Sequence, residues 1–425
     1  MVDREKSKHA RSEKSDRFSE LPDPLISQIL SHLPTKDAVK TSFISTAWRP
    51  LWLSIPQLEL DSREFADLGS FVKFGDRFFD LARTSSVHKI NLTLDSNEDE
   101  DDSYLASWIN AAVKRKIQHL HVRCSSEKRL YEIPKSLYIC ETLVSLELYK
   151  MKMVDAEAFS LPCLKILQLK LIWYLNETTF ERLVSSCPLL EEMKILVDLS
   201  DLKCYRVKSR SLKKFFFVRT SSPSLRGSVS GVVIDAPLLR LVCIYDNVSD
   251  SFLVNNLEHG AKLGLALDFG LKDLDAAGVS SRRNRVRSFL PGISKASSMT
   301  IDADTFKLIH DYSESESLPL FRYMTRLSVT LCVSNLNGLP SFLESCPNLE
   351  VLNVALNDNE EMNQSSFFAP VVPPECLLSS LKVADLDIPI SGYAAEMKLV
   401  KFFLENSPVL KTLALHVKYP PSCRL

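Results

Sequence analysis

The sequence predicts an α/β protein, in which a small all-α segment at the N-terminus precedes a solenoid of strand, loop and helix repeats. In such a solenoid a curved parallel sheet lines the concave side, and helices cover the convex side. Two observations lead to this prediction. Two helix signals lie close together between Asp23 and Trp52, and an apolar template recurs along the rest of the 425 residues, as in Leu143-Leu146-Leu148.

The first helix signal begins at Asp23, which is expected to cap the helix because its carboxylate can accept a backbone N–H. Pro24 follows, with a backbone angle already suited to the first helical turn. Apolar residues then recur at four-residue spacing as far as Leu33. Pro34 is expected to end the helix, since proline lacks an amide donor and restricts the residue before it.

Thr35 is expected to cap the second helix, and Asp37 suits the positive end of its dipole. The apolar positions of this helix form one stripe with spacings of i, i+3, i+4, i+7 and i+8, namely Ile44, Ala47, Trp48, Leu51 and Trp52. A segment of about 40 residues buries too little surface to be stable alone. Its surplus apolar surface therefore covers the next domain, as a helical cap, or docks on another protein.

The residues of this segment resemble the plant F-box, through Leu21-Pro22, the run ILSHLPTK at 29–36, Ser45, Trp48-Arg49 and Trp52. The resemblance implies a helical hook that binds a Skp-type adaptor and, through it, a cullin/RING ubiquitin ligase. Carried over by position, the adaptor-binding residues would be Leu21, Pro22, Leu25, Ile29, Leu30, Leu33, Pro34, Val39, Ser45, Trp48 and Trp52. Ala47 stands where relatives usually have Lys or Arg, and Pro50 lies between the two tryptophans, so both bear on adaptor binding.

The repeat template places apolar residues at positions 0, 3 and 5, and it recurs from Val87 to Leu415. Most steps between first positions are 21 to 32 residues, and one is 57, with Leu263-Leu265-Leu267 near its middle as a degenerate repeat. Prolines at 162, 188, 237, 347 and 408 stand two residues before the template, where each is expected to end a helix. The pattern resembles the irregular leucine-rich repeats that follow plant F-boxes, and it predicts a solenoid over residues 61–425.

The last stretch resembles the FBD module at the end of plant F-box proteins, through CLLSSLK, Glu396 and LVKFFLENSPVLKTL. Physically it consists of two more repeats with a helix between them. Terminal repeats need a protective face, so this module closes the solenoid or, alternatively, has a binding function of its own. The predicted organisation is a disordered tail at 1–15, the F-box at 16–60, leucine-rich repeats at 61–372 and the FBD module at 373–425.

The composition and the N-terminal sequence predict an intracellular protein. A net charge of −1 gives no overall field that favours nucleic acid, and no apolar run approaches the roughly 18 residues needed to span a bilayer. The N-terminus is charged throughout, unlike a signal peptide. The ten cysteines form no CxxC pair and are expected to be buried thiols. We expect a nuclear or cytoplasmic location, no membrane partner and no nucleic-acid partner.

Few residues suggest enzyme chemistry. No GxGxxG, GxxxxGK[ST] or HExxH motif is present. His119 and His121 are expected on one strand face without a third metal ligand, and the acidic run at 97–102 lacks the pattern of a calcium loop. Arg282, Arg283, Arg285 and Arg287 form a basic patch, expected in a surface loop, that is the best candidate for a charged contact. We therefore expect a non-catalytic protein without a cofactor or a metal.

The target-binding surface is predicted from strand geometry, because residues between template positions point away from the core. These residues are Glu191, Glu192, Lys194, Lys213, Lys214, Phe216 and Arg240, with Phe216 as a possible aromatic anchor. The resemblance implies a substrate receptor of a Skp–cullin–F-box ubiquitin ligase, whose solenoid binds the target protein. The alternative is a ubiquitin-independent interaction scaffold or inhibitor whose F-box does not engage the adaptor.

Overall fold

The computed structural model describes residues 21–43, 48, 51–81, 87–95, 103–126, 130–197, 204–219, 231–269, 276–356, 372–387 and 394–416. The predicted tail at 1–15, Ser45, Ala47, Pro50 and the acidic run at 97–102 lie outside these residues. The chain forms two compact units, which comprise residues 1–129 (unit 1) and residues 130–425 (unit 2).

Unit 1 combines short N-terminal helices with the first strand and helix repeats. Its elements are α1 (Asp23–Leu30), α2 (Thr35–Lys40), the 3-10 helices η1 (Thr41–Phe43), η3 (Leu51–Ser54) and η4 (Ser62–Glu64), the strands β1 (Gln57–Asp61), β2 (Lys89–Leu94) and β3 (His119–Cys124), and the helices α3 (Leu68–Leu81) and α4 (Ser103–Lys114). The strands pair in parallel in the order β1-β2-β3. Alternate residues of each strand are buried, as the template predicts.

The N-terminal helices differ from the prediction at both expected caps. Asp23 is the first residue of α1, and the capping position is Pro22, which makes no side-chain hydrogen bond. Thr35 is the first residue of α2, and its hydroxyl accepts the Glu59 backbone N–H of β1 at 2.8 Å. The predicted second helix is divided into α2, η1 and η3 among the described residues. Thr35 therefore joins the helical segment to the first strand instead of capping a helix.

An aromatic layer holds the helices of unit 1 together. Trp52 stacks on Phe74 of α3, with ring centroids 5.8 Å apart. Trp108 of α4 is buried against α3, and its indole N–H donates to Asp76 at 2.8 Å. One side of the N-terminal segment therefore covers the following repeat, as the helical-cap interpretation expects.

Unit 2 contains the remaining repeats. Its strands are β4 (Tyr131–Glu132), β5 (Ser145–Tyr149), β6 (Met151–Lys152), β7 (Ile166–Lys170), β8 (Glu192–Val197), β9 (Cys204–Lys208), β10 (Lys214–Arg219), β11 (Gly231–Asp235), β12 (Leu241–Asp246), β13 (Phe252–Asn255), β14 (Lys262–Leu267), β15 (Ser298–Ile301), β16 (Arg326–Leu331), β17 (Val351–Leu356), β18 (Val383–Asp387) and β19 (Thr412–Leu415). Its helices are α5 (Glu177–Ser185), α6 (Ala276–Ile293), α7 (Ala303–Ser313), α8 (Gly338–Glu344), α9 (Glu375–Ser379) and α10 (Ala394–Asn406), with the 3-10 helices η5 (Lys135–Ile139) and η6 (Val333–Asn335).

The main sheet of unit 2 is parallel, in the order β5-β7-β8-β10-β12-β14-β15-β16-β17-β18-β19. Template positions 3 and 5 fall in register from strand to strand, so Leu146 lies beside Leu167 and Leu167 lies beside Met193. Leu263 and Leu265 occupy the same two rows in β14, between β12 and β15. The degenerate repeat predicted there is confirmed as a regular strand of the sheet.

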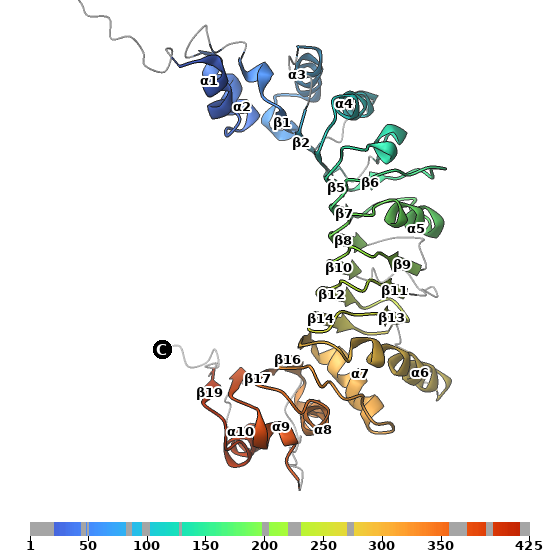
Figure 1. Cartoon of the computed structure of the whole chain (residues 1–425), viewed down its shortest axis with the longest axis vertical. Helices are drawn as coiled ribbons and strands as arrows, with labels where there is room; N and C mark the ends of the chain where they lie inside the picture. The colour runs from blue at the N-terminus through green and yellow to red at the C-terminus, as the bar shows by residue number, and fades with distance from the viewer. Residues whose placement is uncertain are drawn as a thin grey trace, which may run out of the picture. The chain divides into compact units, whose positions relative to one another are not determined.

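The prediction that every repeat contains a helix is wrong between β5 and β7, and it is also wrong for the described residues from 204 to 255. There β9, β11 and β13 form a second, three-stranded parallel sheet. Their sequences, CYRVK, GVVID and FLVN, alternate or are rich in β-branched residues, which favours strands over helices. Figure 1 shows α5, these strands, α6 and α7 on the same side of the main sheet. We call the opposite side of the main sheet the open face.

The basic patch expected in a loop lies instead on a helix, because Arg282 to Arg287 all belong to α6. Only one glycine and no proline interrupt residues 276–290, so nothing in this stretch breaks a helix. Arg285 pairs with Asp250 at 3.4 Å, and the Arg287 Nε donates to Glu316 at 2.8 Å. These acidic partners offset part of the patch's charge, which weakens the case for a charged contact at this site.

Candidate functional site

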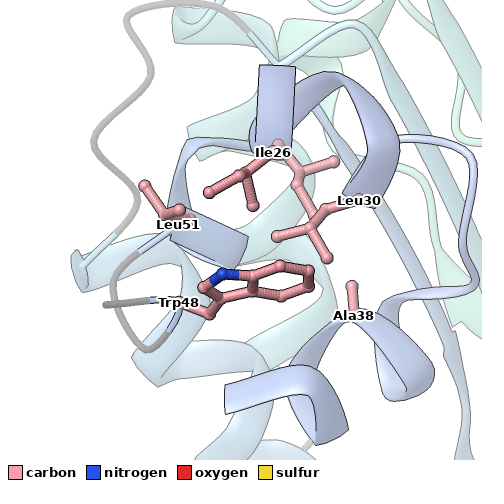
Figure 2. Close-up of a cluster of buried hydrophobic side chains, with 6 residues drawn as sticks. Ile26, Leu30, Ala38, Trp48 and Leu51 are labelled. Atoms are coloured by element: carbon pink, nitrogen blue, oxygen red, sulfur yellow. The ribbon is translucent and has the colours of Figure 1, made fainter. Parts of the chain in front are cut away.

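The N-terminal segment of unit 1 has a hydrophobic core of its own. Figure 2 shows Ile26, Leu30, Ala38, Trp48 and Leu51 gathered around one point between α1, α2 and η3. Ile55 completes this buried cluster, and Leu21, Leu33 and Trp52 pack against it while half-buried. The cluster fixes the orientation of α1, and it therefore decides which side chains this helix presents to solvent.

Helix α1 carries a second apolar face that nothing among the described residues covers. Leu25 and Ile29 lie four residues apart, hence on one side of the helix, and they are 48% and 44% exposed. Their sequence neighbours Ile26 and Leu30 are 1% and 0% exposed. An amphipathic helix of this length needs only one buried stripe, so the outer pair is surplus to the fold.

Phe43 adds to this surface and was not predicted from the sequence. It is the last residue of η1, and its side chain is 85% exposed. The predicted stripe starts one residue later, at Ile44, so Phe43 falls outside the helical periodicity. This position could have indicated that Phe43 is exposed, because a large aromatic residue outside the core stripe of a short helical segment has to face solvent.

The structure divides the predicted adaptor-binding residues into three groups. Pro22, Leu25, Ile29 and Pro34 are exposed; Leu21, Leu33, Val39 and Trp52 are half-buried; and Leu30 and Trp48 are buried. In this structure Leu30 and Trp48 contribute to the core and not to the surface, because they face Ala38 and Leu51. Their effect on docking would be indirect, through the position of α1.

The predicted target-binding residues of unit 2 lie partly on the open face. Glu192 and Lys194 on β8 are in register with Lys214 and Phe216 on β10. The Lys194 ammonium lies 5.1 Å from the centroid of the Phe216 ring, and it also pairs with Glu192 at 2.8 Å. Phe216 is half-buried. It therefore presents an aromatic face that is already covered by a cation.

Glu191, Lys213 and Arg240 lie one step outside the strands, in the turns that precede β8, β10 and β12. Lys213 pairs with Glu191 at 3.0 Å, and Arg240 pairs with Glu258 at 2.9 Å. The hydrogen bond from Lys213 holds the pKa of the Glu191 carboxyl below its ordinary value. The predicted surface is thus a network of neutralised charges, and a target would have to displace some of these pairs in order to bind.

Metal and cofactor chemistry finds little support among these residues. His119 and His121 are both half-buried on β3, and burial lowers the pKa of His119, with a further contribution from Lys89. Within the described ranges no three His, Cys, Asp or Glu side chains gather as a metal site. The same ranges contain no helix that is long and apolar enough to cross a membrane.

Comparison with known families identifies three segments. Residues 18–59 match the F-box domain, residues 105–256 match the leucine-rich repeats of FBD-associated F-box protein At5g56370, and residues 370–415 match FBD. The first match covers α1, α2, η3 and most of β1, and the last covers α9, β18, α10 and β19.

Whole-length relatives agree with these segments. The "Putative FBD-associated F-box protein At5g53635" of Arabidopsis thaliana is 54% identical over 94% of this chain and 94% of its own length. The "Putative F-box/FBD/LRR-repeat protein At5g25850" of the same plant is 47% identical over 98% and 94% of the two chains. The chain belongs to the F-box/FBD/LRR-repeat family. The family resemblance predicted from the sequence is therefore confirmed.

As an F-box/FBD/LRR-repeat protein, the chain combines modules whose common role is protein interaction. Its FBD module consists of the last two strands of the main sheet and the helices beside them. The strands β14 to β17 continue the main sheet between the stretch matched as leucine-rich repeats and the FBD module. The repeats therefore extend beyond the stretch that the repeat family matches.

Proposed function

We propose that this protein is the substrate-recognition subunit of a Skp–cullin–F-box ubiquitin ligase. The observation that carries the proposal is the exposed apolar face of the F-box segment, namely Leu25 and Ile29 on α1, together with Phe43. These side chains lie outside the buried cluster, but the segment that carries them is held in place by it. A rigid, exposed apolar surface is what a partner protein needs for docking.

The partner in this proposal is a Skp-type adaptor, through which the chain would join a cullin/RING ligase. Exposed apolar side chains on a helix fit a hydrophobic groove of the partner, with Leu25 and Ile29 as anchors one helical turn apart. Leu30 and Trp48 would act from beneath, because they keep the outer pair in position.

The main sheet of unit 2 would bind the target protein by its open face, with Glu192, Lys194, Lys214 and Phe216 as contacts. Transfer of ubiquitin would then be chemistry of the other subunits. The contribution of this chain would be proximity, which raises the effective concentration of the target's lysines at the ligase.

An adaptor-binding measurement with matched variants tests the proposal. The test variant is Leu25→Ala/Ile29→Ala. The control is Leu189→Ala/Leu238→Ala, which truncates two leucines of unit 2 whose exposure (50% and 44%) is close to that of Leu25 and Ile29 (48% and 44%). Immobilised Skp-type adaptor should retain the wild type and the control, and it should lose at least about tenfold affinity for the test variant.

Two other results would count against the outer face of α1 as the docking surface. If the folded wild type fails to bind the adaptor, or if both variants bind equally well, the outer face of α1 is not the docking surface. If the folded wild type does not bind the adaptor at all, the ubiquitin-independent scaffold is the better description of the protein.

A further inference from the structure

The C-terminal part of the main sheet carries a pocket of 360 Å³ on its open face. It extends across β15 to β18 and reaches His416, the residue after β19, so the FBD module supplies one of its sides. Its lining residues are Thr300, Ser328, Val329, Thr330, Asn353, Val354, Ala355, Asp385, Asp387 and His416. None of them belongs to the target-binding surface predicted from the sequence.

Strand register explains why a hollow forms here. Thr300, Ser328, Asn353 and Asp385 follow one another in a single row across β15, β16, β17 and β18. Between β8 and β10 such a row carries the large Lys194 and Phe216, whereas here most side chains are short. Short side chains leave a depression above the sheet, and their hydroxyl and amide groups make it polar.

The pocket is acidic. Its ionisable residues are Asp385, Asp387 and His416, and its lining contains neither lysine nor arginine. The central strands differ, since Glu192 there is paired with both Lys194 and Lys214. Like charges repel, so two carboxylates in one pocket favour a positively charged ligand over a negatively charged one.

The geometry of Asp385 points to the same ligand. The His416 Nε2 lies 3.0 Å from Asp385 Oδ1, while the His416 backbone N–H donates to Leu386 at 3.0 Å. The imidazole is not aligned for a hydrogen bond, so Asp385 Oδ1 is buried without a donor among the described residues. Asn353 donates to Ser328 at 3.0 Å, which leaves the Asn353 amide oxygen as an acceptor.

We propose that this pocket binds a lysine or arginine side chain from a basic segment of the target protein. The proposal rests on the proposed function only in taking the ligand to be part of a target. An ammonium or guanidinium group supplies the donors that Asp385, Asp387 and Asn353 can accept. Phosphate-bearing partners, such as nucleic acids, are disfavoured because the two carboxylates would repel them.

The test uses fluorescein-labelled hexalysine as the probe and the full chain as the protein, with binding followed by fluorescence anisotropy. The pocket variant is Asp385→Asn/Asp387→Asn. The control is Glu141→Gln/Glu157→Gln, which changes the net charge by the same amount at exposed positions outside the main sheet. A third variant, Asn353→Ala, removes an acceptor without changing the charge.

The wild type and the control should bind hexalysine with similar affinity, and the pocket variant should bind about tenfold more weakly. Asn353→Ala should weaken binding by about threefold. If the pocket variant binds as well as the control, if the wild type does not bind hexalysine, or if labelled hexaglutamate binds better, the proposal is wrong. The assay contains no adaptor, so its result is independent of the docking test on α1.

Discussion

Helices α3 and α4 of unit 1 approach closely at one glycine, and a single methyl group there has a large predicted effect. A Cβ atom added to Gly75 would lie 2.0 Å from Cζ2 and 2.3 Å from Cη2 of Trp108. Trp108 is 1% exposed, surrounded by Phe71, Phe79 and Tyr104, and hydrogen-bonded to Asp76. The indole therefore has no free space to move into.

Two opposing contributions set the magnitude of Gly75→Ala. Alanine favours the helical state over glycine by about 1 kcal/mol. Overpacking a buried site typically costs about 1–3 kcal/mol, and a 2.0 Å approach to a buried indole belongs at the upper end. We expect Gly75→Ala to lower the free energy of unfolding of unit 1 by about 2 kcal/mol.

Gly69→Ala in the same helix is the matched control, because its added Cβ meets only Asp67 Oδ1 at 3.4 Å. It should leave stability unchanged or raise it by up to about 1 kcal/mol. Urea unfolding followed by tryptophan fluorescence in a Trp173→Phe background measures both, since Trp48, Trp52 and Trp108 all lie in unit 1. If Gly75→Ala proves as stable as Gly69→Ala, the described packing of α3 on α4 is wrong.

Three further predictions concern the helices, the cysteines and the charges. Ile26→Ala should destabilise unit 1 by about 2–4 kcal/mol, because it opens a cavity in the core. Leu25→Ala should change stability by less than about 0.5 kcal/mol, because Leu25 is exposed. Equal losses of stability in urea unfolding would contradict the division of α1 into a buried and an exposed face. Burial raises the pKa of the Cys124 thiol to about 12, whereas Cys163 is exposed. Iodoacetamide at about pH 8 should therefore alkylate Cys163 at least tenfold faster than Cys124 in the folded protein. Peptide mass spectrometry measures both rates, and equal rates would refute this prediction. A hydrogen bond from Lys194 lowers the pKa of the Glu192 carboxyl below its ordinary value of 4.5. The contribution of this ion pair to stability is therefore present above about pH 4.5 and is lost as the pH falls through the lowered pKa. Glu192→Gln should flatten the loss of stability between about pH 6 and pH 3, and an unchanged pH profile would count against the pair.

The sequence predicted the main sheet well, because its signal is repeated many times. Every apolar template repeat from Leu143 to Leu415 corresponds to a strand, and even the degenerate repeat at Leu263 aligns with its neighbours. Strand register in a parallel stack is set by the buried rows, so a periodic sequence determines it. The segments between the strands carry no such repetition. For this reason β9, β11 and β13 and the helix that bears Arg285 were not predicted.

Surface sites were predicted less well, since exposure depends on how short elements pack. Periodicity placed Leu30 and Trp48 among apolar residues of the F-box segment, but it could not tell which face of α1 lies against α2. Phe43 was missed because it lies in η1, one residue before the predicted apolar stripe. The acidic pocket depends on Asp385 and Asn353 standing side by side, and these residues are 32 positions apart in the sequence. Such sites become visible only once the strands are paired.

Co-assembly with purified ligase components tests the central claim most directly. The full chain is mixed with a Skp-type adaptor, a cullin and its RING subunit, and the mixture is separated by size-exclusion chromatography with mass determination. The proposed function predicts a single complex that contains the chain in equal proportion to the adaptor, and Leu25→Ala/Ile29→Ala should elute apart from the other subunits. If the folded wild-type chain elutes apart from the complex of adaptor, cullin and RING subunit, the account is contradicted.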